Sequence, residues 1–193
     1  MSFPDLLVLD DIQLEPFHER HEVELRALEG DDAIFHFHPD DVGPFAAWMN
    51  RWIGAARAST DAIYIVRQSG SVVGSTRFMN IALEHARLEI GGTFYLPARR
   101  RTHTNSVCKK VLLEHAFDVL RLNRVELRCD ARNLASRGAI AKLLAKEEGT
   151  LRHHIVCASG HLRDTVSFAI LREEWPEVRT KLEARIAFAA AFA

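Results

Sequence analysis

Blocks of apolar side chains recur along the chain with two different spacings. Apolar and polar positions alternate in some blocks, which is typical of strands, and apolar positions recur every three to four residues in others, which is typical of helices. Alternation predicts strands at 12–16, 62–68, 71–81, 87–95, 124–129, 149–156 and 162–171. The helical spacing predicts helices at 18–28, 44–56, 104–120, 133–145 and 175–186. This order of elements predicts an α+β (mixed α/β) fold with helices on both faces of a sheet.

The chain shows neither internal repeats nor a linker rich in glycine, serine or proline. Its 193 residues are enough for one domain with a substantial core. We therefore predict a single domain over residues 1–193, with a core from about 12 to 186. The last seven residues, 187–193, read AFAAAFA and are expected to fray as a low-complexity tail.

Composition limits the classes of partner. Charged residues make up 26% of the chain and the formal net charge is −1, so no overall charge favours nucleic acid or an anionic membrane. The N-terminus carries early acidic residues and no long apolar run, and no window has the length of a membrane span. Cys108, Cys129 and Cys157 form no CxxC pair, which predicts buried, reduced thiols. We expect a cytoplasmic protein.

The most informative segment runs from Leu88 to Leu120, where a strand leads through an arginine-rich turn into a long amphipathic helix. A helix begins with unpaired N–H groups and a partial positive charge, and Arg99, Arg100 and Arg101 add full charges. These features together predict a phosphate-binding site. The alternative at this point is a solvated basic surface without a ligand.

Several short motifs follow one another along the chain and carry a family resemblance. They are Leu88-Glu89-Ile90-Gly91, Thr104-Asn105-Ser106-Val107-Cys108-Lys109, Leu112-Leu113-Glu114-His115-Ala116-Phe117, Arg124-Val125-Glu126-Leu127 with Asp130, Arg132-Asn133 with Ser136, Glu148-Gly149-Thr150-Leu151-Arg152, Arg163-Asp164-Thr165-Val166 and Glu174-Trp175-Pro176. In this order they resemble the GNAT superfamily of N-acetyltransferases, and most closely the branch that acetylates the N-termini of ribosomal proteins. The resemblance covers roughly residues 12–186.

The resemblance implies a GNAT fold with a mostly antiparallel, splayed central sheet, and acetyl-CoA (coenzyme A) as the cofactor. It places the pyrophosphate on the residues around the helix start, namely Arg100, Arg101, Thr102, His103, Thr104, Asn105 and Ser106. The pantetheine arm would pair with the backbone of Phe94 or Leu96 and bond to Asn133. One departure is plain, because Arg100, His103 and Asn105 stand where the family usually has Gln or Arg, Gly, and Gly or Ala. Either the loop keeps its shape with bulkier residues, or cofactor binding is weakened.

The resemblance also suggests catalytic residues. Glu89 is the first candidate for the general base, and pairing with Arg77 or Arg87 is its structural alternative. Asp164 is a second candidate that an ion pair with Arg163 would explain equally well. Ser136 would lie near the cofactor thiol and protonate the leaving sulfur.

An Asn at position 133 is also a typical helix N-cap, so capping is the alternative explanation for the Asn133–Ser136 element.

His36, His38, Trp48 and Trp52 are candidates to line the acceptor pocket, although tryptophans are more often core residues. The histidine pairs lack a Cys or carboxylate at ligand spacing, so no metal site is predicted.

The predicted reaction is direct attack of an amine on acetyl-CoA, with a protein or peptide N-terminal α-amine as the acceptor. The alternatives are acetylation of a small-molecule amine, such as an amino acid, polyamine or antibiotic, and a non-catalytic CoA-binding sensor. The resemblance also implies a homodimer.

Overall fold

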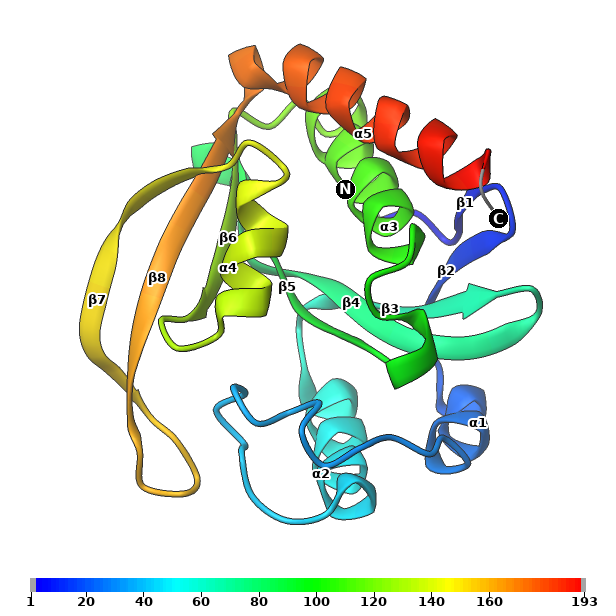
Figure 1. Cartoon of the computed structure of the whole chain (residues 1–193), viewed down its shortest axis with the longest axis vertical. Helices are drawn as coiled ribbons and strands as arrows, with labels where there is room; N and C mark the ends of the chain where they lie inside the picture. Colours follow the sequence, from blue (N-terminus) through cyan, green and yellow to red (C-terminus); the bar gives the residue numbers. More distant parts are fainter. Residues whose placement is uncertain (1–2, 192–193) are drawn as a thin grey trace.

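The structure, a computed structural model, describes residues 3–191. Within this range eight strands form one sheet in the order β1-β2-β3-β4-β5-β6-β8-β7 (Figure 1). Every neighbouring pair is antiparallel except β5 and β6, which run parallel. The strands are β1 Leu7–Leu9, β2 Ile12–Pro16, β3 Ala62–Gln68, β4 Ser71–Ala82, β5 Arg87–Tyr95, β6 Arg124–Asp130, β7 Lys146–Val156 and β8 Leu162–Leu171.

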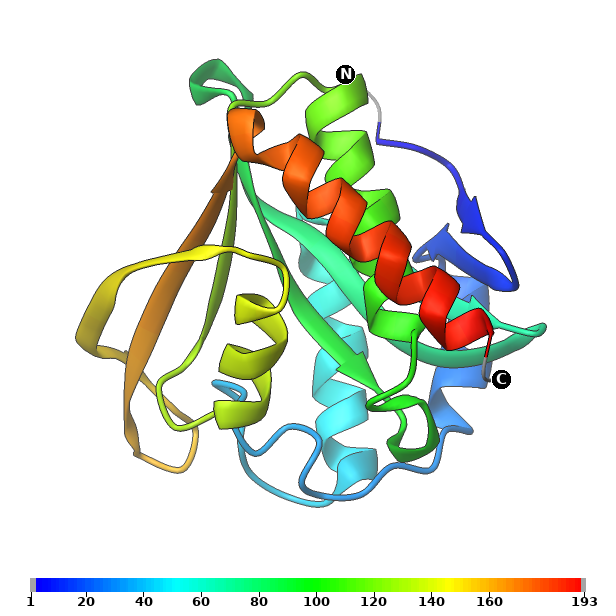
Figure 2. The same cartoon turned by 45° about the horizontal axis from the view of Figure 1, so that its top comes forward.

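Helices cover both faces of the sheet, as the sequence predicts. One face carries α3 (Thr104–Glu114, continued by a π-helical turn, His115–Val119), α4 (Leu134–Ala141) and α5 (Trp175–Ala190). The other face carries the short α1 (Glu22–Arg26) and α2 (Phe45–Ala58). Figure 2 shows α5 lying across α3, with α4 beside β6. The mixed, mostly antiparallel architecture is therefore confirmed.

Each helical layer has its own core. The larger core lies under α3, α4 and α5 and includes Phe78, Leu112 and Phe117, all at most 1% exposed. The smaller core lies under α2 and includes Trp48 and Ile53, which are 2% and 1% exposed. Burial of side chains this large contributes about 1.5–3 kcal/mol each, so both layers are firmly attached to the sheet.

The sheet opens between β5 and β6. These strands pair only through Arg87–Arg124, Leu88–Val125 and Glu89–Glu126, and no pairing continues beyond Glu89 among the described residues. The splayed sheet that the family resemblance implies is thus present. We call the gap that follows Glu89 the opening between β5 and β6.

The structure corrects several predicted boundaries. The predicted helix 18–28 is a 3₁₀ turn (Glu19–His21) followed by five α-helical residues, because Val23 is 77% exposed and only Leu25 on that helix is buried. Strand β1 was not predicted from the sequence. Helix α5 continues to Ala190, so most of the predicted tail is helical, and residues 192–193 lie outside the described range. Alanines are strong helix formers, which accounts for the extension.

Candidate active site

The N-terminus of α3 points toward the end of the opening. The helix begins at Thr104 with His103 as its N-cap, and no side chain caps it. The hydroxyl of Thr102 accepts a hydrogen bond from the Thr104 amide at 3.3 Å. Because the first amides of a helix lack intrahelical partners, those that follow, at Asn105 and Ser106, are the natural donors to an anion.

The loop before α3 keeps a tight turn without glycine. Arg101 adopts the left-handed conformation, with φ of 62°. His103, which stands at a position where the family usually has glycine, has φ of −70°, and Asn105 lies within the helix, so both are in ordinary right-handed geometry. The turn therefore depends on Arg101 and not on a glycine. The left-handed conformation costs an L-residue about 1–2 kcal/mol. Of the two options left open by the sequence, the shape of the loop favours retained binding.

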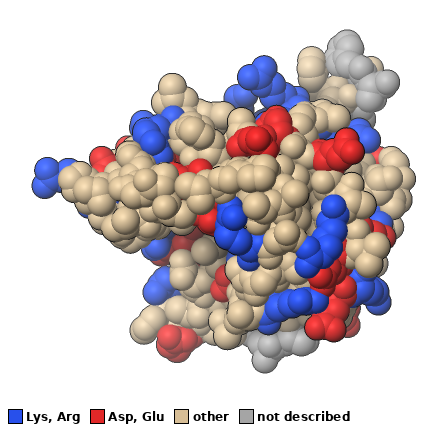
Figure 3. All heavy atoms as spheres, turned by 90° about the horizontal axis from the view of Figure 1, so that it is seen from below, with Lys and Arg blue, Asp and Glu red and all other residues tan. Residues whose placement is uncertain are grey.

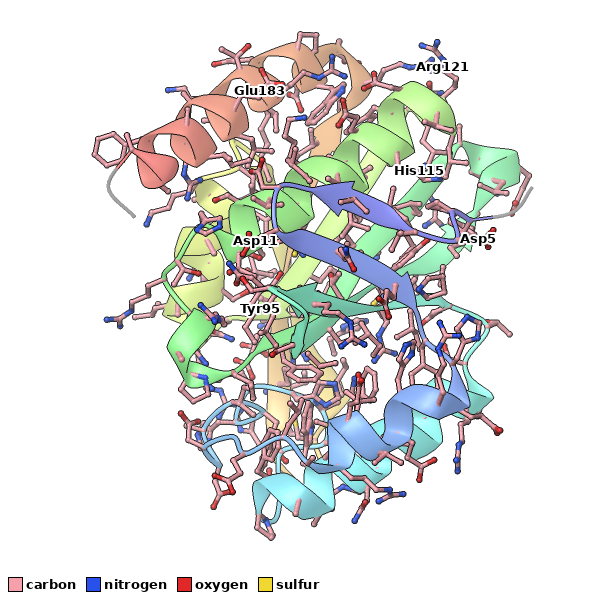
Figure 4. The ribbon with its side chains drawn as sticks, turned by 90° about the vertical axis from the view of Figure 1, so that its right-hand side faces the viewer. Asp5, Asp11, Tyr95, His115, Arg121 and Glu183 are labelled. Atoms are coloured by element: carbon pink, nitrogen blue, oxygen red, sulfur yellow. The ribbon has the colours of Figure 1, made fainter. Side chains whose placement is uncertain are left out.

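Arg100 is held by two protein partners. Its Nε donates to the carbonyl of Tyr95 at 3.1 Å, and its terminal nitrogens bind the Asp31 carboxylate at 3.2 and 3.3 Å. Figure 4 shows Tyr95 at the end of β5 and Asp11 at the turn between β1 and β2. Asp11 lies 3.8 Å from the His103 ring, so an acidic residue stands on either side of the loop. These contacts hold the loop against the end of β5, the segment between α1 and α2, and the turn between β1 and β2.

A cleft of about 580 Å³ lies in front of the loop. Its basic lining combines loop residues with the second half of α5, namely Arg99, Arg101, His103, Lys181 and Arg185. The sequence did not identify Lys181 and Arg185 as site residues. Their four-residue spacing on one face of α5 was the available signal, but only the crossing of α5 over α3 brings that face to the loop. The cleft has the charge required by a phosphorylated cofactor.

Some of the backbone groups predicted to pair with the cofactor, at the end of β5, already have hydrogen-bond partners within the chain. The amide of Leu96 donates to the Val73 carbonyl at 2.9 Å, and its carbonyl accepts from the Arg99 amide at 2.9 Å. Phe94 lies opposite Ser75 in the β4–β5 ladder. Pairing of a ligand with Phe94 or Leu96 therefore stays a prediction, and both backbone groups of Leu96 already have partners within the chain.

Helix α4 begins on the other side of the opening. The Asn133 side chain accepts a hydrogen bond from the Ser136 amide at 2.9 Å, so Asn133 is an N-cap as its residue type predicts. Ser136 lies against the Cys129 thiol. Burial raises the pKa of Cys129, and the contact with Ser136 opposes that rise. The cap and the serine thus both lie at the mouth of α4, next to β6.

Glu89 occupies the last position at which β5 and β6 are paired. Its side chain is 7% exposed, and Oε2 accepts a hydrogen bond from Asn80 at 2.7 Å. The nearest cation is Arg128, whose Nε lies 3.6 Å away, rather than Arg77 or Arg87. Burial raises the pKa of Glu89, with Asn80 and Arg128 opposing the rise. A buried carboxyl with a raised pKa at the point where two strands part is a candidate general base.

Aromatic residues line the α2 side of the opening. Trp48 and Trp52 pack edge-on against Phe94, with ring centroids 5.1 and 5.7 Å apart. His38 lies edge-on to Trp48 at 5.9 Å, whereas His36 is exposed. Both tryptophans belong to the core under α2, yet their indole N–H groups are buried without a hydrogen-bond partner. Residues 36–38 form a turn, so the two histidines do not share the face of a strand.

The segment between α1 and α2 closes against the β7–β8 hairpin. The Pro39 carbonyl accepts from the Ala158 amide at 2.8 Å, and Asp41 accepts from both the amide and the hydroxyl of Ser159. Figure 1 shows this segment reaching the lower end of the hairpin. The α2 side of the opening is therefore covered by loops from two distant parts of the chain.

Surface charge and metal ligands add little to this picture. On the face that Figure 3 shows, lysines and arginines are interspersed with acids. Among residues 3–191 no three potential ligands are grouped closely enough to hold a metal ion. No helix within the same range is long and apolar enough to cross a membrane. The three cysteines are free and buried, as predicted.

Residues 11–145 match the family described as the acetyltransferase (GNAT) domain. The chain belongs to the GNAT acetyltransferase superfamily. An uncharacterized N-acetyltransferase, p20 of Bacillus licheniformis, is 30% identical over 111 residues, which are 58% of this chain. The matched region spans 61% of that curated relative, less than two thirds of its length.

Solved GNAT structures share the whole fold. A protein assigned as an acetyltransferase from T. thermophilus superposes with a TM-score of 0.86 at 30% identity, over 96% of this chain and 99% of that one. A GCN5-related N-acetyltransferase from Brucella melitensis has a TM-score of 0.84 at 26% identity, over 93% and 84% of the two chains. The chain thus shares the GNAT fold with these structures over more than nine tenths of its length.

Two more distant structures share the fold and contain CoA. RimJ of Mycobacterium smegmatis, in complex with CoA-disulfide, has a TM-score of 0.71 at 20% identity over 90% and 88% of the chains. Spermidine N-acetyltransferase of Vibrio cholerae, in complex with CoA and spermine, has a TM-score of 0.68 at 14% identity over 86% and 98%. GNAT acetyltransferases use acetyl-CoA, and the basic lining of the cleft is compatible with the phosphates of that cofactor.

Proposed function

We propose that the protein transfers the acetyl group of acetyl-CoA to a primary amine, and that the acceptor is the N-terminal α-amine of a protein or peptide. The observation that carries the proposal is the position of Glu89, which is buried at the point where β5 and β6 part. The sequence resemblance to N-terminal acetyltransferases supports this choice of acceptor.

The cofactor, when bound, supplies an acetyl thioester. The amides of Asn105 and Ser106, with Arg101 and Lys181, would hold its phosphates. The Glu89 carboxylate accepts the proton that the attacking amine loses. An α-amine has a pKa of about 8, and a buried carboxyl with a raised pKa is a better-matched base than an exposed one. The Ser136 hydroxyl donates a proton to the sulfur as the carbon–sulfur bond breaks and the carbon–nitrogen bond forms, and it takes a proton back from water.

Acceptor panels test the proposal. Peptides that begin with Ala or Ser are compared with free amino acids, polyamines and aminoglycosides, with thiol release and product mass as the two readouts. We expect acetylated peptides, and a decrease of about tenfold in the rate for Ser136→Ala. Turnover of small amines alone would contradict the N-terminal acceptor. Binding of CoA without turnover of any amine would indicate a sensor. Unchanged rates in both Glu89→Gln and Ser136→Ala would refute the assigned residues.

We also propose that the protein is a homodimer, as the resemblance implies. The edge strand β7 is exposed along almost its whole length, and Leu151, Val156 and Leu162 expose apolar side chains on the β7–β8 hairpin. Light scattering coupled to size exclusion measures the mass directly. A monomer at micromolar concentration would contradict this proposal without affecting the enzymatic one.

A further inference from the structure

Arg163 is a buried arginine without a partner. It lies at the start of β8 and is 7% exposed. Its Nε is sealed from solvent with no hydrogen-bond partner, and no other described residue forms an ion pair or hydrogen bond with its side chain. Buried arginines are almost always paired, because an uncompensated buried charge is costly. A cation left in this state is suited to a ligand that supplies the missing acceptor.

A second unsatisfied group lies on the same strand face. Thr165 follows Arg163 by two residues, so both side chains lie on one face of β8. The Thr165 hydroxyl is also buried without a partner. The acids nearby are already engaged. Asp130, opposite Thr165, binds the Arg132 guanidinium at 2.7 Å, and Asp164 accepts from the His153 amide at 2.7 Å.

Further buried donors face the same region from the sheet and from α2. Arg77 Nε, Trp48 Nε1 and Trp52 Nε1 are all buried and unpartnered. The His38 ring lies edge-on to Trp48. Burial is the main cause that lowers the pKa of His38 to about 4, with the charges of Arg77 and Arg163 contributing and those of Asp40 and Asp41 opposing, so His38 lies within electrostatic reach of both arginines. A terminal nitrogen of Arg77 pairs with Asp61 at 3.7 Å, but its Nε and the two indole N–H groups have no acceptor among the described residues. Because an unpaired buried donor is costly, the region suits a ligand that supplies acceptor atoms.

The donor-rich region adjoins the candidate base. Burial raises the pKa of Glu89, and the charge of Arg163 is among those that oppose the rise. Glu89 on β5 and Arg163 on β8 lie on the side of the sheet that faces α2. Ile90, next to Glu89, and Val166, three positions after Arg163, point to the other side because strand residues alternate, and both belong to the core under α3, α4 and α5. An acceptor could therefore present its amine to Glu89 and a second, anionic group to Arg163.

We propose that Arg163 and Thr165 bind a carboxylate of the acceptor, adjacent to the amine that is acetylated. The proposal rests on the proposed function, in that the acceptor amine must reach Glu89. A guanidinium binds a planar carboxylate through two parallel hydrogen bonds, and a threonine hydroxyl adds a third donor. The carboxylate can be the α-carboxylate of a free amino acid or the acidic side chain of a peptide's first residues.

Matched acceptor pairs test the proposal and separate the two sources. One arm compares free Ala and Glu with alaninamide and glutamine amide. The other compares C-terminally amidated peptides that begin with Asp or Glu with those that begin with Asn or Gln. In at least one of the two arms, the acceptor with the carboxylate should have a kcat/KM at least about tenfold higher than its amide counterpart. Turnover without a preference in either arm would overturn the proposal.

Variants of Arg163 test whether this residue causes the preference for carboxylate acceptors. Arg163→Gln should abolish the discrimination while leaving the KM for acetyl-CoA and the thermal unfolding midpoint within the range of Arg152→Gln, an exposed arginine on the neighbouring strand β7. Arg163→Lys should retain part of it, because lysine keeps the charge but not the bidentate geometry. Equal losses for acidic and amide acceptors in Arg163→Gln would show a structural role and refute the proposal.

A binding measurement distinguishes failure of the carboxylate site from failure of the proposed function. Calorimetry with CoA present compares N-acetylalanine and N-acetylglutamate with their α-amides, and acetylated, C-terminally amidated Asp and Glu peptides with their Asn and Gln counterparts. Binding of carboxylate probes that Arg163→Gln weakens at least about tenfold supports the carboxylate site even if no amine is turned over. Equal binding of acids and amides by the wild type in both series would overturn it even if the enzyme is active.

Discussion

On the α3 side of the opening between β5 and β6, Arg101 is exposed and Arg99 half-buried, and both line a cleft open to solvent. On the α2 side, Arg163 is buried, the Arg77 side chain is only 11% exposed, and the Nε of each lacks a hydrogen-bond partner. Water and salt screen the first pair, so each cation there contributes little and neighbours can replace it. Low exposure removes most of that screening from the second pair. We infer that affinity for the cofactor is distributed over many groups, whereas selection of the acceptor depends on a few.

The largest effect is expected for Glu89→Gln, at the point where β5 and β6 part. We expect kcat/KM to fall at least about 100-fold, since the amide cannot accept the amine's proton. The raised pKa of Glu89 should appear as an ascending limb in the wild-type pH profile, and the variant should lack it. The KM for acetyl-CoA should not change. Glu84→Gln, an exposed glutamate before β5, serves as the control. A variant with a wild-type rate and profile would place the base elsewhere.

Acid stability provides a second test, on the α2 side. Burial lowers the folded-state pKa of His38 to about 4, against about 6.5 in the unfolded chain. Between these values the unfolded chain binds more protons, so His38 stabilises the fold above pH 6.5 and loses this contribution as the pH falls toward 4. The loss should be up to about 3 kcal/mol.

Urea unfolding from pH 8 to pH 4 measures this loss as the difference between the wild type and His38→Gln. His153→Gln, at an exposed position on β7, is the matched control and should show no such difference. Parallel pH dependence in wild type and His38→Gln would mean that His38 is not buried in a neutral form.

The smallest effect is expected on the α3 side. Arg101→Ala should raise the KM for acetyl-CoA only about two- to fivefold at low ionic strength, and the difference should shrink as salt is added. Arg121→Ala is a matched control, because Arg121 is exposed with φ of 57° and lies at the far end of α3 (Figure 4). A salt-independent loss of 100-fold in Arg101→Ala would contradict a distributed cofactor site.

The sequence predicted the elements that bury a regular pattern. Strand β5 begins and ends as expected, at Arg87 and Tyr95, and α3 begins at Thr104, because periodic burial produced the pattern itself. Strand β1 was not predicted from the sequence, because it has only three residues at the edge of the sheet and Val8 is 51% exposed. Its position depends on pairing with β2, which no local pattern encodes.

The candidate site was only partly predictable. Glu89, Asn133 and Ser136 could be selected because they lie in recognisable motifs. Arg163 could not, because the sequence places Asp164 beside it as an apparent ion-pair partner, whereas adjacent strand residues point to opposite faces. Whether a buried arginine has a partner is a property of the assembled fold. The same holds for Lys181, which reaches the loop only through the crossing of α5 over α3.

The three-residue contact between β5 and β6 has a consequence for hydrogen exchange. Beyond Glu89, the backbone groups on the β6 side of β5 have no strand opposite them, while those on the β4 side remain paired along the ladder. The two edges of one strand should therefore exchange deuterium at different rates in the free protein. A ligand arm that lies along β5 would slow the faster set alone, so those amides of residues 90–95 that face the opening would report cofactor binding without any chemical turnover.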